Sequence, residues 1–486
     1  MTECFRLVVV ADVGGDDRRH IGDEAMLEAN VAAFRRHVPQ VEFTVVSRDP
    51  AWVRARYGVE AIAPPQFPAD SLARNGEAAT LDDFLERCLH GGPGDDIAQA
   101  VSSADAVLIS GGGNLSSSWP DLLIERVVVL QLADHYGKPS LVTGQTLGPR
   151  LQADQREVLG RALSLARFVG VREIPSATLA LELGVDAERL WHQVDDAFFP
   201  DATPAMPSST GSGATIVVTL DPQLRASDAG AFDAFANQLA EVALQVGAPL
   251  VLVPHVFGNE AANAPSDLTE ARILAERLAP VRCHIAIGVD VKQARQIVLD
   301  AALVVSSRYH PIVFAVQAGI ACIGIHGDEY CRIKLQGALL HARQERWSLT
   351  YAEVKNGGMT PLALTAWRLR AEFRERAAQR HSSWIEDHER RWVAMLRALD
   401  PQRFVEPIRD VTRLFGHPVD VAATALIAAM QCRRRAWELD HIEFENIRGR
   451  QEQAEQTVQK LDLELAPGRT IRRYAAELLR RLRGLR

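Results

Sequence analysis

Short apolar runs alternate with amphipathic, helix-like stretches along the first two thirds of the chain. The runs are rich in β-branched residues and apolar at nearly every position, which is typical of strands buried on both faces of a parallel sheet. In the first part of the chain these expected strands are 6–13, 41–47, 106–110, 140–144 and 168–172. Helical patterns such as 23–37, 122–136 and 153–166 separate them, as in α/β domains.

The stretch 200–213 contains almost no large apolar residue and interrupts this alternation. Its Pro, Ser, Thr and Gly residues are typical of a linker. The alternation restarts with an expected strand at 214–220 and an expected helix at 229–246. The sequence therefore predicts two doubly wound, Rossmann-like α/β domains, residues 1–203 and 204–345. Ligands are expected in the cleft between them, at the carboxyl ends of the strands.

Residues 346–486 are predicted to form a helical extension, because the strand pattern disappears after about residue 359. Residues 433–465 are charged and almost free of Gly and Pro, which favours an exposed helix or a short coiled coil. Residues 469–486 carry seven arginines and one acid, with their apolar residues on one helical face. Two interpretations remain open for this segment: contact with an anionic membrane surface, or packing on protein.

Composition narrows the class of protein. The net charge of −8 argues against a protein that coats nucleic acid. The sequence contains no run of eighteen apolar residues, so no membrane-spanning helix is predicted. The N-terminus lacks the pattern of a signal peptide, and the six cysteines contain no Cys-x-x-Cys pair. We therefore expect a cytoplasmic protein with free thiols, with 469–486 as its candidate contact with the inner face of the membrane. The proline- and glycine-containing interval 64–94 is expected to be an excursion over the ligand cleft or an exposed insertion.

The first polar cluster that could carry chemistry is Gly22, Asp23 and Glu24, at the start of the first expected helix. Glycine allows a close approach of the backbone, and the first turn of a helix has unpaired N–H groups. The alternative is that the two acids only cap the helix. The cluster is not a dinucleotide-binding motif, because Gly-x-Gly-x-x-Gly does not occur here.

Two further loops follow expected strands. The segment 111–114 contains three consecutive glycines before Asn114, and such a run favours a place where the backbone approaches a ligand, here through Gly112 and Gly113. Gln145, after the next strand, could donate to a substrate oxygen or satisfy the carbonyls of its own loop.

Charged residues also follow expected strands. Arg172 ends one of them, and a buried arginine there needs an anion, either a ligand or an internal partner such as Glu173 or Asp195. In the second half, His255 ends a strand and is expected to point toward the cleft. Arg308 and His310 combine a permanent cation with a group that can carry a proton at neutral pH, at the start of a helix. We consider Arg308 and His310 the best candidates for catalysis, with Ser307 beside them.

These motifs, in this order, resemble those of the polysaccharide pyruvyl transferase family. The motifs are Gly-Asp-Glu-Ala at 22–25, the glycines at 111–113, Gly-Gln-x-x-Gly-Pro at 144–149, Val-Arg-Glu-x-x-Ser at 171–176 and Ser-x-Arg-x-His at 306–310. The resemblance covers about residues 7–337. One departure is the segment before Gly22, where members usually carry an Asn and this chain has Asp16-Asp17-Arg18-Arg19-His20.

The resemblance implies a fold similar to that of GT-B glycosyltransferases and a transferase that needs neither a metal nor a cofactor. Family members transfer the enolpyruvyl unit of phosphoenolpyruvate onto two hydroxyls of a sugar of a cell-surface polysaccharide or its precursor, which forms a pyruvate ketal. The expected partners are thus phosphoenolpyruvate and a glycan or lipid-linked oligosaccharide. Arg172 and Arg308, from opposite halves, would bind the donor anion. His310 would be the acid, and Asp23 or Glu24 the base or acceptor-binding group.

Two other functions share these features. A GT-B glycosyltransferase that uses a nucleotide sugar would have the same architecture and the same cleft. A scaffold without activity, within a polysaccharide assembly complex, would use the long helix and the basic segment instead. The presence of Arg172, Arg308 and His310 argues against the scaffold.

Overall fold

The computed structural model describes residues 4–14, 19–65, 85–86, 88–89, 95–198, 215–257, 266–401 and 404. Residues Met1–Val411 form one compact unit and Thr412–Arg486 a second one, and every structural statement below concerns the first unit. Four expectations lie wholly or mostly outside the described residues: the excursion at 64–94, the linker at 200–213, the helix at 433–465 and the basic segment at 469–486.

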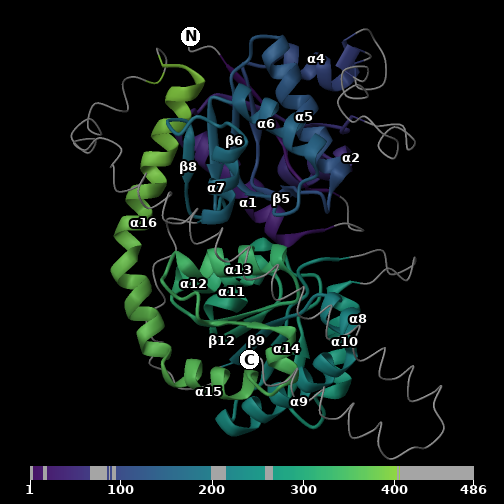
Figure 1. The fold of residues 1–486 in the computed structure, drawn as a ribbon, viewed down its shortest axis with the longest axis vertical. Coiled ribbons are helices and arrows are strands. Elements are labelled where there is room, and N and C mark those ends of the chain that lie inside the picture. Colours follow the sequence, from purple (N-terminus) through teal and green to yellow (C-terminus); the bar gives the residue numbers. More distant parts are fainter. Residues whose placement is uncertain are drawn as a thin grey trace, which may run out of the picture. The chain divides into compact units, whose positions relative to one another are not determined.

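The first half of the unit contains a parallel sheet of eight strands (Figure 1). The strands are β1 (Phe5–Val10), β2 (Val41–Val46), β3 (Glu60–Ile62), β4 (Ala106–Ile109), β5 (Gly112–Leu115), β6 (Ser140–Leu147), β7 (Phe168–Val171) and β8 (Leu190–His192). Their order is β3-β2-β1-β4-β6-β7-β8, and β5 pairs with the end of β6. The chain changes direction across the sheet between β1 and β4, which is where such sheets bind ligands.

The second half contains a parallel sheet of six strands. They are β9 (Thr215–Thr219), β10 (Leu250–Leu252), β11 (Cys283–Ile285), β12 (Ala301–Ser306), β13 (Ala321–His326) and β14 (Ser348–Thr350). Their order is β11-β10-β9-β12-β13-β14, so β9 and β12 flank the switch point of this sheet. The edge strand β14 extends this sheet beyond residue 345, where the sequence placed the end of the domain.

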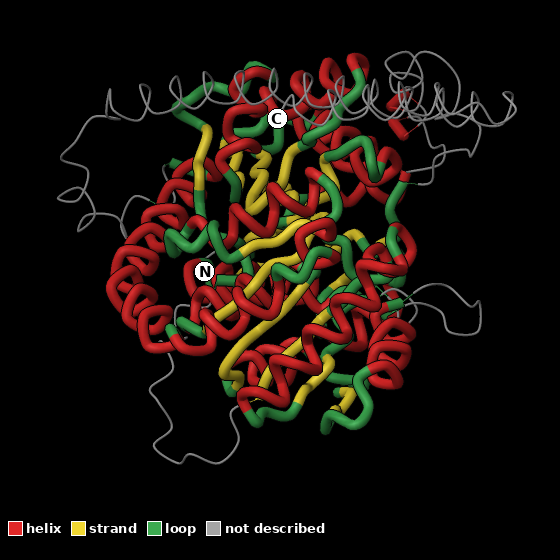
Figure 2. The backbone as a smooth tube through the Cα atoms, turned by 60° about the horizontal axis from the view of Figure 1, so that its bottom comes forward, coloured by secondary structure: helices red, strands yellow, loops and turns green. Residues whose placement is uncertain are grey.

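Helices lie on both faces of each sheet (Figure 2). Those of the first half are α1 (Ile21–His37), α2 (Pro50–Tyr57), α4 (Asp95–Ser103), α5 (Pro120–His135), α6 (Ala153–Leu165) and α7 (Ile174–Glu182). Those of the second half are α8 (Gln223–Ser227), α9 (Ala229–Val246), α10 (Asp267–Arg277), α11 (Val291–Leu299), α12 (Tyr309–Ala318), α13 (Glu329–Leu340), α14 (Tyr351–Lys355) and α15 (Met359–Arg368). This architecture confirms the predicted fold class.

Local sequence signals explain where these elements begin and end. In β1 every residue but Arg6 is buried, as expected for a strand covered on both faces. Helix α9 begins after Asp228, whose side chain accepts a hydrogen bond from the backbone N–H of Ala231. It ends at Gly247, which has a left-handed backbone conformation with φ of 66°.

The hydrophobic core joins the two halves at helix α1. Ile21, Ala25 and Met26, in the first turns of α1, are buried in the same cluster as the core of the second half. The later part of α1, including Phe34, packs on the first sheet. Because one helix belongs to two cores, the two halves share an apolar contact beside the carboxyl ends of their strands.

Helix α16 (Arg370–Leu399) extends along both halves (Figure 1). Trp384 is buried in the core of the second half, whereas Trp392 lies edge-on against Phe34 of the first half, with ring centroids 4.9 Å apart. Between them, the buried guanidinium of Arg391 pairs with Asp196 at 2.9 Å. The first part of the predicted helical extension is therefore packed on both halves.

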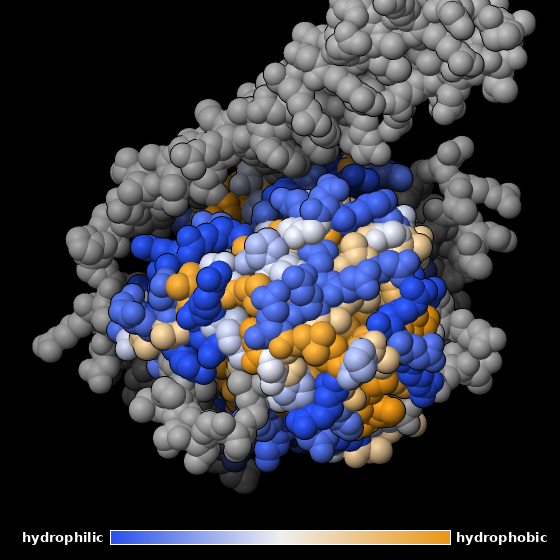
Figure 3. Space-filling view, turned by 90° about the horizontal axis from the view of Figure 1, so that it is seen from below, coloured by the Kyte–Doolittle hydropathy of each residue, from blue (hydrophilic) through white to orange (hydrophobic). Residues whose placement is uncertain are grey.

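Figure 3 views the second half from below. Its described surface is largely hydrophilic, and hydrophobic residues gather in patches between the hydrophilic ones. In the described part of the chain, no helix is long and apolar enough to cross a bilayer. The five described cysteines, Cys4, Cys88, Cys283, Cys322 and Cys331, are free thiols, as predicted.

Candidate active site

His310, in the first turn of α12, lies where the two halves meet. Its Nε2 lies 3.6 Å from the Asp195 carboxylate, which follows β8 in the first half. On its other side, the imidazole packs on Gly22 of α1 so closely that a Cβ at this glycine would lie 1.8 Å from Nδ1. The side chain is 12% exposed. The second half thus inserts a histidine between two elements of the first half.

His20, immediately before α1, is held by backbone contacts between the halves. It forms an antiparallel bridge with Val256, and the next residue, Ile21, donates its N–H to the carbonyl of His255 at 3.0 Å. Its Nδ1 lies 3.1 Å from the Asp23 carboxylate. Burial would lower the pKa of His20, but the hydrogen bond to Asp23 and the charges of Asp23 and Asp12 outweigh it and raise the pKa.

Asp23 faces three groups that can carry positive charge. Burial would raise its pKa, but the hydrogen bond from His20 and the charges of His20, His310 and Lys334 outweigh it and lower the pKa. The carboxylate is therefore the favoured form of Asp23 in a site that attracts anions.

Asp12, just after β1, lies beside His20 and Asp23. Its carboxylate accepts a hydrogen bond of 3.3 Å from the amide of Asn114, which lies in β5. One ligand atom each of Asp12, His20 and Asp23 lie within 4.8 Å of one another, so these three side chains could also hold a divalent cation. The prediction that no metal is needed stays a prediction.

Lys334, in α13, supplies a cation from the second half. Its ammonium lies over the rings of Tyr330 and Tyr309, at 4.6 and 5.5 Å from their centroids. The hydroxyl of Tyr330 donates to the carbonyl of Gly113 in the first half at 2.8 Å. Within the described residues, no carboxylate lies at ion-pair distance from Lys334. A half-buried ammonium without a carboxylate partner is a suitable site for an anionic ligand.

Arg308 lies directly before α12. Its Nε and Nη2 bind the buried carboxylate of Asp267, with a shortest distance of 2.6 Å, and its side chain is 31% exposed. Among the described residues its Nη1 makes no hydrogen bond, so one edge of the guanidinium remains free for a ligand. Ser307 accepts from the N–H of Asp221 at 2.8 Å and thus connects β12 with the segment after β9.

Arg172 has a different environment from the one expected for a donor-binding residue. Its side chain is 1% exposed and pairs with Asp195 at 2.7 Å and Glu173 at 3.1 Å. Although burial would raise the pKa of Asp195, the charges of Arg172 and His310 lower it. At Glu173, burial dominates and raises the pKa. Of the two alternatives that the sequence left open for Arg172, a ligand or an internal acid, the structure shows the second. Arg172 is the counter-ion that holds Asp195 in place.

Three more expected site residues are buried, and two of them are occupied by internal contacts. Glu24 is 1% exposed and binds Arg19 through both carboxylate oxygens. Gln145 is fully buried and donates to the carbonyl of Ser110, as the loop alternative predicted. Neither ring nitrogen of His255 has a hydrogen-bond partner among the described residues, and burial with the nearby charges of His310 and Arg308 lowers its pKa to about 3.

The triple glycine is approached by the protein's own side chains. Gly111 donates its N–H to Asp196 at 3.0 Å, and a Cβ at Gly113 would lie 2.0 Å from the Tyr330 hydroxyl. Gly112 and Gly113 belong to β5, where the sequence predicted a loop. The glycines do allow a close approach to the backbone, as predicted. The group that approaches is the Tyr330 side chain of the second half, next to Lys334, and not a ligand.

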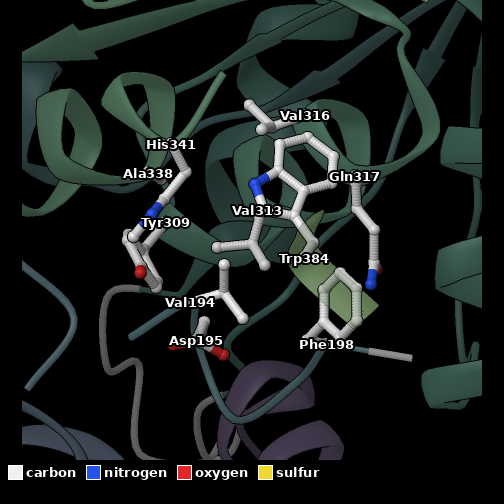
Figure 4. Close-up of a pocket in the computed structure, with 10 residues that line it drawn as sticks. All are labelled: Val194, Asp195, Phe198, Tyr309, Val313, Val316, Gln317, Ala338, His341 and Trp384. Carbon is white, nitrogen blue, oxygen red and sulfur yellow. The ribbon is translucent and has the colours of Figure 1, made fainter. Parts of the chain in front are cut away.

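A small cavity lies beside Asp195 (Figure 4), and Trp384 of α16 is among the residues that line it. The lining residues are Val194, Asp195, Phe198, Tyr309, Val313, Val316, Gln317, Ala338, His341 and Trp384. Its volume of about 30 Å³ has room for water and not for a sugar or phosphoenolpyruvate. Substrate binding therefore belongs on the side of His310 that faces Asp23 and Lys334.

The sequence interpretation placed His20 in the polar cluster before the first helix but assigned it no role, and it missed Lys334 as a site residue. His20 lies in a loop before a helix, and nothing in that segment shows that its backbone pairs with Val256. Lys334 lies inside a helix, where a lysine is normally a solvent-facing residue. The one available signal was its spacing of four residues from Tyr330, which places both side chains on one helical face.

The chain resembles several solved structures, and one with a TM-score above 0.5 supports the fold class. A protein of Listeria monocytogenes, assigned as a UDP-N-acetylglucosamine 2-epimerase, is 14% identical with a TM-score of 0.51; the match covers 78% of this chain and 91% of that one. The UDP-GlcNAc 2-epimerase of Neisseria meningitidis is 10% identical with a TM-score of 0.48, covering 79% and 100%. HepE of Anabaena, solved with UDP and glucose, is 14% identical with a TM-score of 0.49, covering 79% and 98%.

A search of curated proteins found no match. A sequence model of one family, described as polysaccharide pyruvyl transferase, matches residues 20–328. This range contains every side chain that meets at the site except Asp12, Tyr330 and Lys334. Because the match covers more than half of the chain, the protein belongs to the polysaccharide pyruvyl transferase family.

Proposed function

We propose that the protein transfers the pyruvyl group of phosphoenolpyruvate to two hydroxyls of one sugar, in a cell-surface polysaccharide or its precursor, and releases phosphate. The observation that carries this proposal is the position of His310, between Asp195 and Gly22 and beside Asp23, in a member of this family. A histidine that can donate a proton lies there at the junction of two sheets, near the carboxyl ends of their strands.

Phosphoenolpyruvate carries a phosphate and a carboxylate, so its site needs at least two cations. We assign these roles to Lys334 and Arg308, because the ammonium of Lys334 has no carboxylate partner among the described residues and Arg308 has a free guanidinium edge. Arg172 is not assigned a contact with the donor, because its guanidinium is buried and paired with two acids.

The reaction needs a proton at the methylene carbon of the donor. We assign that proton to His310; its transfer converts the methylene to a methyl group and leaves an oxocarbenium-like centre at the neighbouring carbon. The first sugar hydroxyl adds there and loses its proton to the His20–Asp23 pair. Phosphate then leaves, the second hydroxyl adds to the same carbon, and its proton leaves with the phosphate. Proton exchange with solvent restores His310 and the His20–Asp23 pair.

This assignment modifies the expectation for the base. Asp23 keeps its role together with His20, to which it is hydrogen-bonded at 3.1 Å. Glu24 loses its role, because both of its carboxylate oxygens bind Arg19.

The direct test is incubation of the full chain with phosphoenolpyruvate and a panel of glycans, followed by phosphate assay and mass spectrometry of the glycan. We expect phosphate release that depends on the glycan and a mass gain that corresponds to a pyruvate ketal. In parallel reactions, UDP-sugars replace phosphoenolpyruvate. Glycosyl transfer from a UDP-sugar, without ketal formation, would instead support the glycosyltransferase alternative.

His310→Ala tests the acid directly. We expect kcat to fall by about 100- to 10,000-fold, the usual contribution of general acid catalysis. His284→Ala is the control, because His284 is an exposed histidine on the edge strand β11. If His310→Ala retained turnover within about threefold of the wild type, His310 would not be the acid.

A further inference from the structure

A second, larger cavity lies on the first half at the carboxyl edge of its sheet. Its volume is about 390 Å³, within the range of about 300–1,000 Å³ that is typical of small-molecule sites. Asp12 and Gly14 line it from the segment after β1, and Arg48 from the segment after β2. Trp119 and Asp121 line it from the start of α5. This is the edge at which open α/β sheets bind ligands.

Two residues that line the cavity, His20 and Asp12, also belong to the site around His310. The carboxylate of Asp23 lies 3.1 Å from His20. Asp23 follows Gly22, on which the imidazole of His310 packs. A ligand in the cavity would therefore have one end beside the catalytic groups.

The charges of the cavity favour a neutral ligand. Two carboxylates, Asp12 and Asp121, line the cavity together with one guanidinium, that of Arg48, which also lies 3.5 Å from Glu125. An anion such as a nucleotide diphosphate would face both acids. Hydroxyl groups can donate to the carboxylates and accept from the guanidinium, so this lining suits a polyhydroxylated molecule.

Trp119 gives the cavity an aromatic wall. Its side chain is 48% exposed, and its neighbours Ser118, Pro120 and Asp121 are exposed as well, so the indole is accessible to a ligand. Sugar rings have an apolar face of C–H groups and a polar edge, so one ring can pack on an indole while its hydroxyls reach charged residues. The indole and the charged groups line the same cavity.

We infer that this cavity binds the acceptor sugar, with the ring against Trp119 and the two reacting hydroxyls at the end formed by Asp12 and His20. The inference rests on the proposed function. It adds the position of the acceptor, and it specifies that the part of the acceptor bound in this cavity is an uncharged sugar. Donor and acceptor then approach Asp23 from opposite sides, the donor from Lys334 and the acceptor from Trp119.

The test compares Trp119→Ala, Trp119→Phe and Leu244→Ala in the full chain. Leu244 is a matched control because it is 64% exposed and lies on α9 in the second half. The probes are the methyl glycosides of glucose, galactose, mannose and their N-acetylated amino derivatives, and their β1,4-linked disaccharides. Binding is measured without phosphoenolpyruvate, by saturation-transfer NMR, and KM values are measured separately with turnover.

We expect Trp119→Ala to weaken binding of the best sugar and raise its KM by about tenfold or more. Trp119→Phe should keep most of the affinity, and the KM for phosphoenolpyruvate should stay within twofold in all variants. Unchanged sugar binding in Trp119→Ala would overturn the inference, as would a wild type that binds none of the probes. Tight, Trp119-dependent binding of UDP in place of sugars would also overturn it. Trp119-dependent sugar binding without pyruvyl transfer would support the cavity assignment while the proposed function failed.

Discussion

The imidazole of His310 rests on the backbone of Gly22, and the two residues come from opposite halves of the protein. A Cβ at Gly22 would lie 1.8 Å from Nδ1 of His310 and 2.4 Å from Cε1, so the position can hold only glycine while the ring stays where it is. The glycine of the Gly-Asp-Glu motif therefore has a steric role in placing the histidine.

Gly22→Ala should displace the imidazole of His310 and lower kcat by about 100-fold, because a shift of about 1 Å at a reacting group has an effect of this size. The control is Gly230→Ala, at the same second position of helix α9, where a Cβ would lie 3.2 Å or more from its neighbours. Thermal unfolding should show that both variants are folded. Wild-type kcat in Gly22→Ala would show that the contact does not position His310.

Lys334→Met should raise the KM for phosphoenolpyruvate by about 10- to 100-fold, which corresponds to the loss of one hydrogen bond to a charged group. The KM for the acceptor should change little, because Lys334 lies on the donor side. Steady-state kinetics at two salt concentrations would measure both constants. Lys292→Met is the control, since Lys292 is exposed on α11. A donor KM equal to that of the control would remove Lys334 from the site.

Arg172→Met should lower the free energy of unfolding by about 3–5 kcal/mol, because it leaves the buried carboxylates of Asp195 and Glu173 without their cation. Urea denaturation would measure the change. Arg156→Met, which removes a half-exposed pair with Glu182, should cost no more than about 1 kcal/mol. An unchanged unfolding midpoint combined with a raised KM for phosphoenolpyruvate would restore the donor-binding role for Arg172.

Glu28→Gln should stabilise the protein increasingly as pH rises from about 4 to 7, and by a constant amount above pH 7. Burial on α1 raises the pKa of Glu28 to about 7, helped by the charges of Glu24 and Asp290 and opposed by those of Arg56 and Arg19. In the unfolded chain the carboxyl ionises near its ordinary pKa of about 4.3. Between these values the folded state holds the extra proton, so stability falls as pH rises and stays reduced above pH 7.

Glu28→Gln has no carboxyl group at this position, so its stability does not fall as pH rises. We therefore expect its Tm to be about 2–4 °C above that of the wild type at pH 8 and equal to it at pH 4. Glu157→Gln, at an exposed position of α6, is the control. The same Tm difference at both pH values would show that ionisation of Glu28 is not its cause.

Removal of divalent cations tests the Asp12, His20 and Asp23 group. If these side chains bind protons and sugar hydroxyls, dialysis against EDTA should leave kcat within about twofold. Metal analysis of the dialysed protein should accompany the assay. A loss of activity that added Mn²⁺ or Zn²⁺ restores would show instead that the group is a metal site and would exclude the His20–Asp23 pair as a base.

The sequence predicted the strands and helices that have a clear apolar pattern. It did not predict elements whose formation depends on contacts with distant segments. The expected helix at 229–246 coincides with α9, because its cap residues and its apolar face are both local signals. Strand β5 was missed, because Gly112-Gly113-Asn114-Leu115 has low strand propensity and forms a strand only by pairing with β6.

The same difference applies to the site. The strand–loop–helix context correctly placed His310 at a helix start near the carboxyl edge of a sheet. It could not show that Arg172 meets Asp195, since the two are 23 residues apart and the ion pair depends on the packing of β7 against β8. For the same reason it could not distinguish His255, which the fold buries, from His20, which the fold brings to the cavity.

The packing of α16 has a consequence for synthesis of the protein on the ribosome. Asp196 in the first half finds its cation, Arg391, almost two hundred residues later, and Trp392 completes the apolar layer over Phe34. The first half therefore cannot finish folding when its own strands have emerged. Until residue 392 leaves the exit tunnel, the Asp196 carboxylate has hydrogen bonds but no cation, and an apolar face over Phe34 is uncovered. This nascent intermediate is where we expect chaperones to bind.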